Sequence, residues 1–462
     1  MENLTLTLEA GAKQPMYEQL YRFFAEGIGA GRLSAGEKLP SKRALCAHLG
    51  VSVSTVEAAY GMLVSEGYVT AKPQSGYYVS DFVTFDAPEA GKRHAAGVPP
   101  RPAPPRPEID LSTAAVDTSL FPYSSWAKLN KEVVYSSPEL LQRGDRQGDE
   151  PLRRALCEFL AEYRGVRCAP EQIVVGAGLE YLTGLLFALF RPEAVFGVED
   201  PGYASIYHML RAHGRRVCFL PMDGEGARPD APEARGANVL YLTPSHQFPM
   251  GVTMPASRRS RLLRWAAEGE ERWIVEDDYD SEFRYGLRTI PAMQGMDGAG
   301  RVVYISTFSR SLAPSVRIAY MVLPPALLER YRAMEGYHLS TVSRYEQAVM
   351  ARFLSEGYYA RYLRRVGNLY RRRRDALTQA LAAIDGVSVS GAGGGIHFLL
   401  TLPRYSEEEL ISRARGEGIE LRGLSEYCRA CAPEPSTLVV GYGGLDDGKI
   451  DEAARRLAAA WG

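Results

Sequence analysis

The residues that could do chemistry lie in five polar clusters, most of which directly follow a short apolar run. Such runs, alternating with helical stretches, predict an α/β fold with a mostly parallel sheet between helices. Because ligands of these sheets bind beyond the carboxyl ends of the strands, we expect the clusters to converge on one crevice. The runs are 173–175, 194–198, 239–242, 273–275 and 302–306, and the clusters are 176–178, 199–203, 243–251, 276–282 and 309–317.

Position 310, in the last cluster, carries an arginine between two serines. A lysine amine can lose its proton and attack an aldehyde, whereas a guanidinium stays protonated and is not a usable nucleophile. No lysine occurs between positions 132 and 448. That stretch therefore offers no amine for Schiff-base chemistry. Arginine far outnumbers lysine throughout the chain, so a general drift from lysine to arginine is an alternative explanation of Arg310.

Composition predicts an ordinary globular protein of two or three domains. The chain has 462 residues, 46% hydrophobic and 24% charged, with a net charge of -1. These values exclude extensive disorder and give no sign of a strongly basic nucleic-acid or membrane surface. No N-terminal signal segment and no run of 18 apolar residues is present, so we expect a cytoplasmic protein. The pair Cys428-x-x-Cys431 lacks a second ligand pair, and no metal is predicted.

The first 80 residues predict a winged helix-turn-helix. Apolar spacing indicates helices at 16–28, 41–49 and about 52–66, and two β-rich runs at 68–70 and 76–79 form a hairpin. The third helix is capped by Ser52 or by Ser54, the latter in a capping box with Glu57. Its buried face is predicted to hold Val56, Ala59, Tyr60, Leu63 and Val64.

Residues 81–108 are rich in proline and arginine and predict an extended, semi-rigid linker. The linker separates an N-terminal domain, residues 1–80, from a large domain, residues 109–462. We expect the last part of the large domain, from about 345 to 462, to form a small α+β subdomain.

Three segments of the N-terminal domain resemble the GntR superfamily of bacterial transcription factors: Leu39-Pro-Ser-Lys-Arg-Ala-Leu45, 48–56 and 66–77. The resemblance implies that the third helix enters the major groove of DNA and that the hairpin touches the minor groove or the backbone. The implied DNA-contacting residues are Lys42, Arg43, Ser52, Ser54, Thr55, Lys72 and Gly76. Val53 replaces an arginine usual in that family, and residues 1–80 balance seven basic and seven acidic side chains. A helix-turn-helix kept only for assembly is therefore the alternative.

The five polar clusters resemble, in order and spacing, those of fold-type I aminotransferases. Together with the N-terminal module they resemble the MocR/GabR-type regulators, in which an aminotransferase-like domain senses an effector for a GntR-type domain. The resemblance implies a site for pyridoxal phosphate (PLP), with Arg310 at the position of the Schiff-base lysine, so that PLP is held without a covalent bond or is absent. The implied site residues are Ala177, Gly178, Tyr203, His246, Asp277, Tyr279, Thr307, Ser309, Arg310 and Arg317.

The resemblance also implies a role for each residue. Small residues at 176–178 let backbone N–H groups meet the phosphate at a helix start, and Thr307, Ser309 and Arg317 complete that side. Tyr203 stacks on the ring, Asp277 pairs with the pyridinium nitrogen, Tyr279 contacts the 3-oxygen, and His246 lies near the ring. Outside the family, the same residues are typical of a tight turn, a core aromatic, a solvated acidic loop and a structural histidine.

Two further departures oppose an enzyme. The arginine that binds a substrate carboxylate in aminotransferases is absent near 439–442, and GABA-sensing relatives have an arginine where this chain has Ser205; Arg429 is a weak alternative. We therefore expect a non-catalytic transcription regulator that binds operator DNA and a small-molecule effector as a homodimer, with a domain-swapped head-to-tail arrangement as one form. The alternatives are an aminotransferase with a fused helix-turn-helix, a regulator whose lost PLP site serves only dimerisation, and an introduced Lys→Arg change at 310.

Overall fold

The structure is a computed structural model that describes residues 6, 8–9, 14–81, 107–228, 230, 236–285, 290–334, 339–432 and 435–462. It divides into two compact units, residues 1–104 and 105–462. The predicted linker at 81–108 lies, apart from its ends, outside the described residues. No helix in the described ranges is long and apolar enough to cross a membrane.

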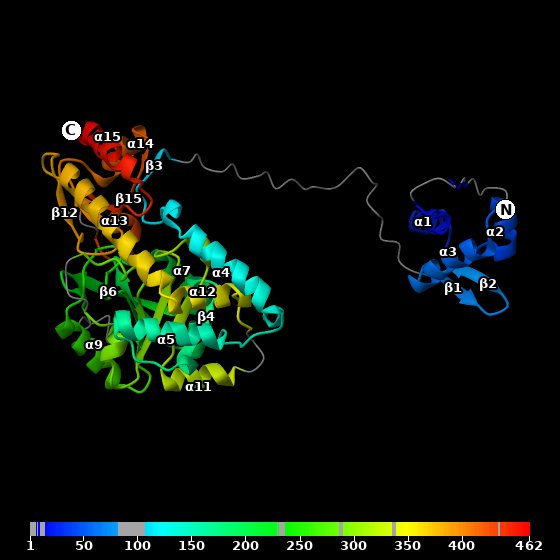
Figure 1. The fold of residues 1–462 in the computed structure, drawn as a ribbon, viewed down its shortest axis with the longest axis horizontal. Coiled ribbons are helices and arrows are strands. Elements are labelled where there is room, and N and C mark those ends of the chain that lie inside the picture. The colour runs from blue at the N-terminus through cyan, green and yellow to red at the C-terminus, as the bar shows by residue number, and fades with distance from the viewer. Residues whose placement is uncertain are drawn as a thin grey trace. The chain divides into compact units, whose positions relative to one another are not determined.

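The N-terminal unit is the predicted winged helix-turn-helix (Figure 1). Its strands pair antiparallel, with Val69 opposite Val79. Its core brings together side chains from all three helices and from both strands. The elements are α1 (Met16–Gly29), α2 (Lys42–Leu49), α3 (Val53–Ser65), β1 (Val69–Lys72) and β2 (Gly76–Val79).

The start of α3 decides between the two predicted caps. The Ser52 hydroxyl accepts a hydrogen bond from the backbone N–H of Thr55 at 3.2 Å, so Ser52 is the N-cap. The capping box of Ser54 with Glu57 is wrong, because the Glu57 carboxylate lies 2.8 Å from Nζ of Lys42. Of the residues predicted on one face of α3, Val56, Ala59, Tyr60 and Leu63 are buried, whereas Val64 is 37% exposed.

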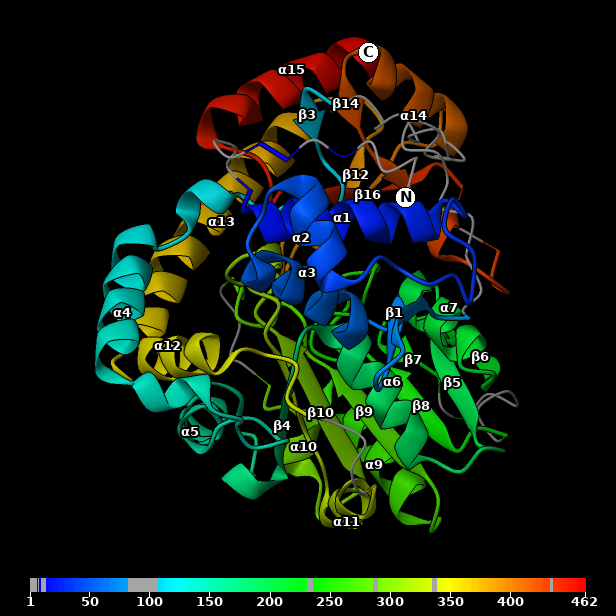
Figure 2. The same ribbon diagram turned by 90° about the vertical axis from the view of Figure 1, so that its right-hand side faces the viewer.

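The large unit is built on an eight-stranded sheet in the order β4-β11-β10-β9-β8-β5-β6-β7 (Figure 2). The strands from β10 to β6 are parallel, whereas β11 and β7 run antiparallel to their neighbours. The predicted mostly parallel sheet is confirmed. The bounds are β4 (Ile173–Gly176), β5 (Val195–Asp200), β6 (Arg216–Asp223), β7 (Gly226–Ala227), β8 (Val239–Leu242), β9 (Trp273–Asp277), β10 (Val302–Thr307) and β11 (Ala319–Val322).

Helices cover both faces of this sheet. Successive side chains of a strand point to opposite faces of a sheet. In β10, Val303 and Ile305 pack in one hydrophobic cluster and Tyr304 packs in another, so both faces are covered. One face is covered by α6 (Leu179–Leu189), α7 (Ala204–Ala212) and α11 (Pro325–Ala333), and the other by α4 (Tyr123–Ser136), α5 (Glu150–Arg164), α12 (Arg344–Ser355) and α13 (Tyr358–Leu381). The helices α9 (Ala256–Ala267) and α10 (Met293–Met296) pack near β9 and β10.

The C-terminal part forms its own layer, which Figure 1 shows beside one end of α13. Its antiparallel sheet has the order β12-β13-β16-β15, and β3 (Ile109–Asp110) pairs in parallel with β14 (Ile419–Glu420). The other elements are β12 (Ser388–Ser390), β13 (His397–Thr401), β15 (Arg422–Gly423), β16 (Thr437–Gly441), α14 (Glu407–Gly416) and α15 (Ile450–Trp461). Short 3-10 turns occur at Thr118–Leu120, Pro138–Leu141, Pro170–Gln172, Pro314–Val316, Leu424–Tyr427 and Asp447–Lys449.

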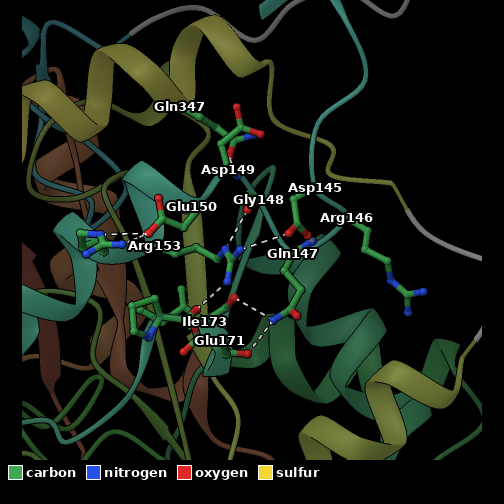
Figure 3. Close-up of polar contacts among 12 residues, drawn as sticks. Asp145, Arg146, Gln147, Gly148, Asp149, Glu150, Arg153, Glu171, Ile173 and Gln347 are labelled. Atoms are coloured by element: carbon green, nitrogen blue, oxygen red, sulfur yellow. Dashed lines mark hydrogen bonds and ion pairs between the residues drawn. The ribbon is translucent and has the colours of Figure 1, made fainter.

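Arg153 of α5 holds the loop before α5 against the edge strand β4 (Figure 3). Its guanidinium donates to the carbonyl oxygens of Gly148, at 2.8 Å, and Pro170, at 2.9 Å, and pairs with Asp145. Gly148 has φ 100°, and a Cβ there would lie 2.7 Å from the Val175 side chain. Only glycine therefore lets the loop approach β4 so closely, and β4 leads directly into the 176–178 cluster.

Candidate functional site

A pocket with about 610 Å³ of free space lies at the carboxyl ends of β5, β8, β9 and β10. We call it the strand-end pocket; it is the crevice that the polar clusters predicted. Seven of the predicted residues line it: Tyr203, Asp277, Tyr279, Thr307, Ser309, Arg310 and Arg317. The others that line it are Leu179, Glu180, Thr243 and Phe248, of which Thr243 and Phe248 belong to a polar cluster that the sequence showed.

Asp277, the last residue of β9, presents an unsatisfied carboxylate oxygen. Its side chain is 3% exposed, and Oδ2 accepts a hydrogen bond of 2.7 Å from the Tyr241 hydroxyl. Oδ1 is buried and has no hydrogen-bond partner. Burial raises the pKa of Asp277 to about 7, against the effect of the Tyr241 hydrogen bond. A buried polar atom without a partner is costly, so Oδ1 is suited to a donor from a ligand.

Arg317 lies at the other end of the strand-end pocket, against the start of α6. Gly178 precedes α6 with φ 96°, and a Cβ on it would lie 2.2 Å from Nη2 of Arg317. The guanidinium is already paired, because Nη2 lies 2.6 Å from Oε2 of Glu180. Burial opposes ionisation of Glu180, but the hydrogen bond from Arg317 lowers its pKa overall. An anion that binds Arg317 must therefore compete with Glu180.

The predicted backbone donors at 177 and 178 are already used. The N–H of Ala177 donates to the Thr341 hydroxyl at 2.9 Å, and the N–H of Gly178 donates to the carbonyl of Gly176 at 2.9 Å. The expectation that both N–H groups face a phosphate is thus not met in this conformation, because Thr341 and Gly176 already accept from them. The hydroxyls of Thr307 and Ser309, 3.0 Å apart, remain on the pocket wall.

His246 lies behind Tyr279 and does not line the strand-end pocket. The Tyr279 hydroxyl is 3.1 Å from Nδ1 of His246 and 3.0 Å from its carbonyl oxygen, and Nδ1 also contacts Asp280 at 3.0 Å. Burial raises the pKa of Tyr279 well above its usual value, so this phenol stays protonated. That His246 lies near a bound ring stays a prediction; in this structure it contacts the pocket through Tyr279.

Tyr203 and Phe248 form the aromatic wall. Their rings meet edge to face, with centroids 5.8 Å apart, and Tyr203 is 37% exposed. A ring that is part exposed beside a pocket offers a face for stacking. The sequence predicted a role for Tyr203, whereas a role for Phe248 follows only from its contact with that ring.

Arg310 lines the strand-end pocket, and its guanidinium donates to the carbonyl of Thr113. The pocket therefore carries a permanent cation at this position, and no lysine is among its lining residues. Arg429 does not line the pocket, because its side chain bonds to the carbonyls of Glu426 and Cys428.

The predicted DNA-contacting residues lie on α2, on the first turn of α3 and on the wing. Arg43 is exposed, whereas Lys42 is paired with Glu57 and lies 5.6 Å from the ring centre of Tyr77. Ser52 caps α3, and Val53 beside it is 49% exposed. Of the remaining predicted residues, Ser54 and Lys72 are exposed, and Thr55 and Gly76 are half-buried.

Comparison with known proteins agrees with this two-part architecture. Residues 16–79 match the model of the bacterial regulatory proteins of the gntR family, and residues 106–457 match aminotransferase class I and II. Such a combination defines a class of transcription regulators with an aminotransferase-like domain. The chain belongs to the MocR type of this class: it is 34% identical to the probable rhizopine catabolism regulatory protein MocR of Rhizobium meliloti, over 99% of this chain and 96% of that protein.

Two further proteins are similar, one over nearly the whole chain and one over about three quarters of it. The uncharacterized HTH-type regulator YdeL of Bacillus subtilis is 37% identical over 97% of each chain. A crystal structure of Pyrococcus horikoshii kynurenine aminotransferase in complex with PMP aligns with a TM-score of 0.68 and 27% identity, over 76% of this chain and 90% of that one. The chain is thus a DNA-binding transcription regulator with an aminotransferase-like unit of fold type I.

Proposed function

We propose that the strand-end pocket binds a phosphorylated pyridine, PLP or its amine form, without a covalent bond, and that this binding biases the affinity of the N-terminal unit for operator DNA. The observation that carries the proposal is the unpartnered Oδ1 of Asp277 in a pocket that also holds Arg310 and Arg317. The N–H of the pyridine ring would donate to Oδ1 of Asp277, and the phosphate would be attracted to Arg310 and Arg317.

The lining residues fit such a ligand at both ends. Asp277 would accept from the ring nitrogen, Tyr203 would stack on the ring, and Tyr279 would bond its 3-oxygen. Ser309 and Arg317 would hold the phosphate after Arg317 leaves Glu180. When bound, this cofactor supplies an electron-poor ring that stabilises negative charge on an attached amino acid.

We infer that the protein is not an aminotransferase. Position 310 would have to take up and return a proton, and a guanidinium does not release its proton at accessible pH. The Arg310 guanidinium also donates a hydrogen bond to the Thr113 carbonyl, which holds the side chain in place. Arg310 can attract an anionic ligand. Because it also bonds to the Thr113 carbonyl, ligand binding can affect the segment around residue 113.

The regulator works, in this proposal, as a homodimer that reads two operator half-sites. A ligand with different affinity for two arrangements of the units shifts the balance between them. Arg43 on α2 and the exposed first turn of α3 would contact the DNA, with Lys72 on the wing against a phosphate.

A thermal-shift series tests the ligand. PLP and pyridoxamine phosphate should raise the melting temperature of the full chain, whereas unphosphorylated pyridoxal should not, because it lacks the group that Arg317 binds. Operator binding measured with and without the effective ligand should then differ. Equal and negligible shifts for all three compounds would show that the aminotransferase-like unit serves only for dimerisation.

A further inference from the structure

A compact group of metal-binding side chains lies outside the strand-end pocket. Asp200, the last residue of β5, is 3% exposed, and Cys428 and Cys431 lie in the loop that follows the 3-10 turn Leu424–Tyr427. The two Sγ atoms and a carboxylate oxygen of Asp200 all lie within 4.8 Å of one another. The sequence shows only the C-x-x-C pair, and the fold brings a third ligand to it.

We propose that Asp200, Cys428 and Cys431 bind one Zn²⁺ ion, with a fourth position open to water. A tetrahedral zinc site, with bonds of about 2.3 Å to sulfur and 2.0–2.2 Å to oxygen, needs ligand atoms roughly 3.5–3.8 Å apart. The observed separations, at most 4.8 Å, exceed these distances by roughly 1 Å at most. Two thiolates with one carboxylate suit Zn²⁺, and its binding releases the two thiol protons to solvent.

The carboxylate is already oriented for this role. Oδ1 of Asp200 accepts one hydrogen bond, from the N–H of Arg429 at 2.8 Å, and Oδ2 accepts two, from Ala430 at 2.6 Å and Cys431 at 2.7 Å. A carboxylate oxygen has two lone pairs, so Oδ1 keeps one for a metal ion. Such hydrogen bonds to a ligand are typical of the surroundings of metal sites.

The three side chains are also accessible to a metal ion. A cavity with about 810 Å³ of free space adjoins Asp200 and both cysteines, which gives an ion access and leaves room for a water ligand.

A bound ion would fasten the C-terminal loop to one wall of the strand-end pocket. Asp200 begins the turn that carries Tyr203, and the N–H of Gly202 in that turn donates to the Tyr427 carbonyl at 3.1 Å. Zinc would therefore hold the 424–432 loop and the Tyr203 turn together. This effect on the pocket rests on the proposed function, whereas the metal site does not.

Metal analysis of the reduced full-length protein tests the site. After incubation with Zn²⁺ and gel filtration, we expect one zinc per chain, and Cd²⁺ should give the ultraviolet charge-transfer absorption of Cd–thiolate bonds. The variant Cys428→Ser/Cys431→Ser should lose both signals. The matched control Cys157→Ser/Cys168→Ser removes another thiol pair, with Sγ atoms 3.8 Å apart, and should keep them.

Three results would overturn the proposal: a wild-type protein without stoichiometric zinc, equal zinc in the Cys428→Ser/Cys431→Ser variant, or a peroxide-induced Cys428–Cys431 disulfide in a protein that binds no zinc. Melting curves of both variants show whether they fold, and because the cysteines are part exposed we expect that they do. Loss of zinc with a retained shift by pyridoxamine phosphate would separate this site from the proposed function.

Discussion

The guanidinium of Arg317 occupies the space in which a side chain at position 178 would begin. A Cβ on Gly178 would lie 2.2 Å from Nη2 and 2.6 Å from Cζ of Arg317, and the backbone at 178 has φ 96°. A glycine at this turn thus places the cation beside Glu180 at the start of α6. The proposed anion-binding end of the pocket depends on that contact.

Gly178→Ala should therefore abolish stabilisation by pyridoxamine phosphate. The added methyl group displaces Arg317 and strains a backbone conformation that other residues rarely adopt. Gly367→Ala is the control, because a Cβ there meets no atom within 4 Å and alanine favours a helix by up to about 1 kcal/mol. An unchanged thermal shift in Gly178→Ala would remove Arg317 from the phosphate site.

Arg310→Lys should restore covalent attachment of PLP. Borohydride treatment should leave a pyridoxyl group on the peptide that contains Lys at 310, and none on this segment of the wild-type protein, because only the amine is a nucleophile. Arg429→Lys, which adds a lysine outside the strand-end pocket, is the control. If Arg310→Lys stays unmodified while it folds, the pocket no longer accepts the cofactor.

Asp277→Asn should change the pH dependence of stability. Burial raises the pKa of Asp277 in the folded protein to about 7, from about 3.9 in an unfolded chain. A raised pKa contributes stability that is fully present below about pH 4 and is lost as the pH rises through about 7. The melting temperature of Asp277→Asn relative to wild type should thus rise between pH 5 and pH 8, by a few degrees.

Exposed Asp385→Asn should show no such trend. A difference between Asp277→Asn and wild type that is constant over this pH range would mean that Asp277 is ionised throughout, for example because a cation stays bound to Oδ1.

Arg43→Ala should weaken binding to operator and to unrelated DNA alike. A charge-assisted phosphate contact is worth about 1 kcal/mol or more, and its loss should reduce the slope of log affinity against log salt by about one. Arg22→Ala, on α1 and paired with Glu18, is the matched control for loss of one charge. If Arg43→Ala and Arg22→Ala behave alike, Arg43 makes no phosphate contact. If the wild-type protein shows no salt-sensitive binding to its own upstream region, the helix-turn-helix serves assembly.

Local rules predicted the elements well. Ser41 caps α2 and Gly50 ends it with φ 65°, as their sequence positions indicated. The predicted strands agree with β4, β5, β8, β9 and β10. The first residue of each agrees to within one position, and the observed strands extend at most two residues farther at the carboxyl end. Caps and apolar periodicity act over a few residues, so they can be recognised without knowledge of the fold.

Contacts between distant segments could not be predicted in this way. Glu180 and Arg317 are 137 positions apart, and β11 runs antiparallel to β4, which brings the residues before one strand beside those after the other. Other contacts between distant segments place His246 behind Tyr279 and pair the Ala177 N–H with Thr341.

The sequence by itself determined the two-part architecture, the residues gathered at the strand ends and the absence of an amine at position 310. These follow from residue type and from the rule that parallel strands end on one side of a sheet. Only the tertiary structure decided which groups are already paired, which oxygen of Asp277 has no partner, and that Asp200 joins Cys428 and Cys431. Pairing and burial depend on the packing of chain segments far apart in sequence, whereas residue type and local spacing do not.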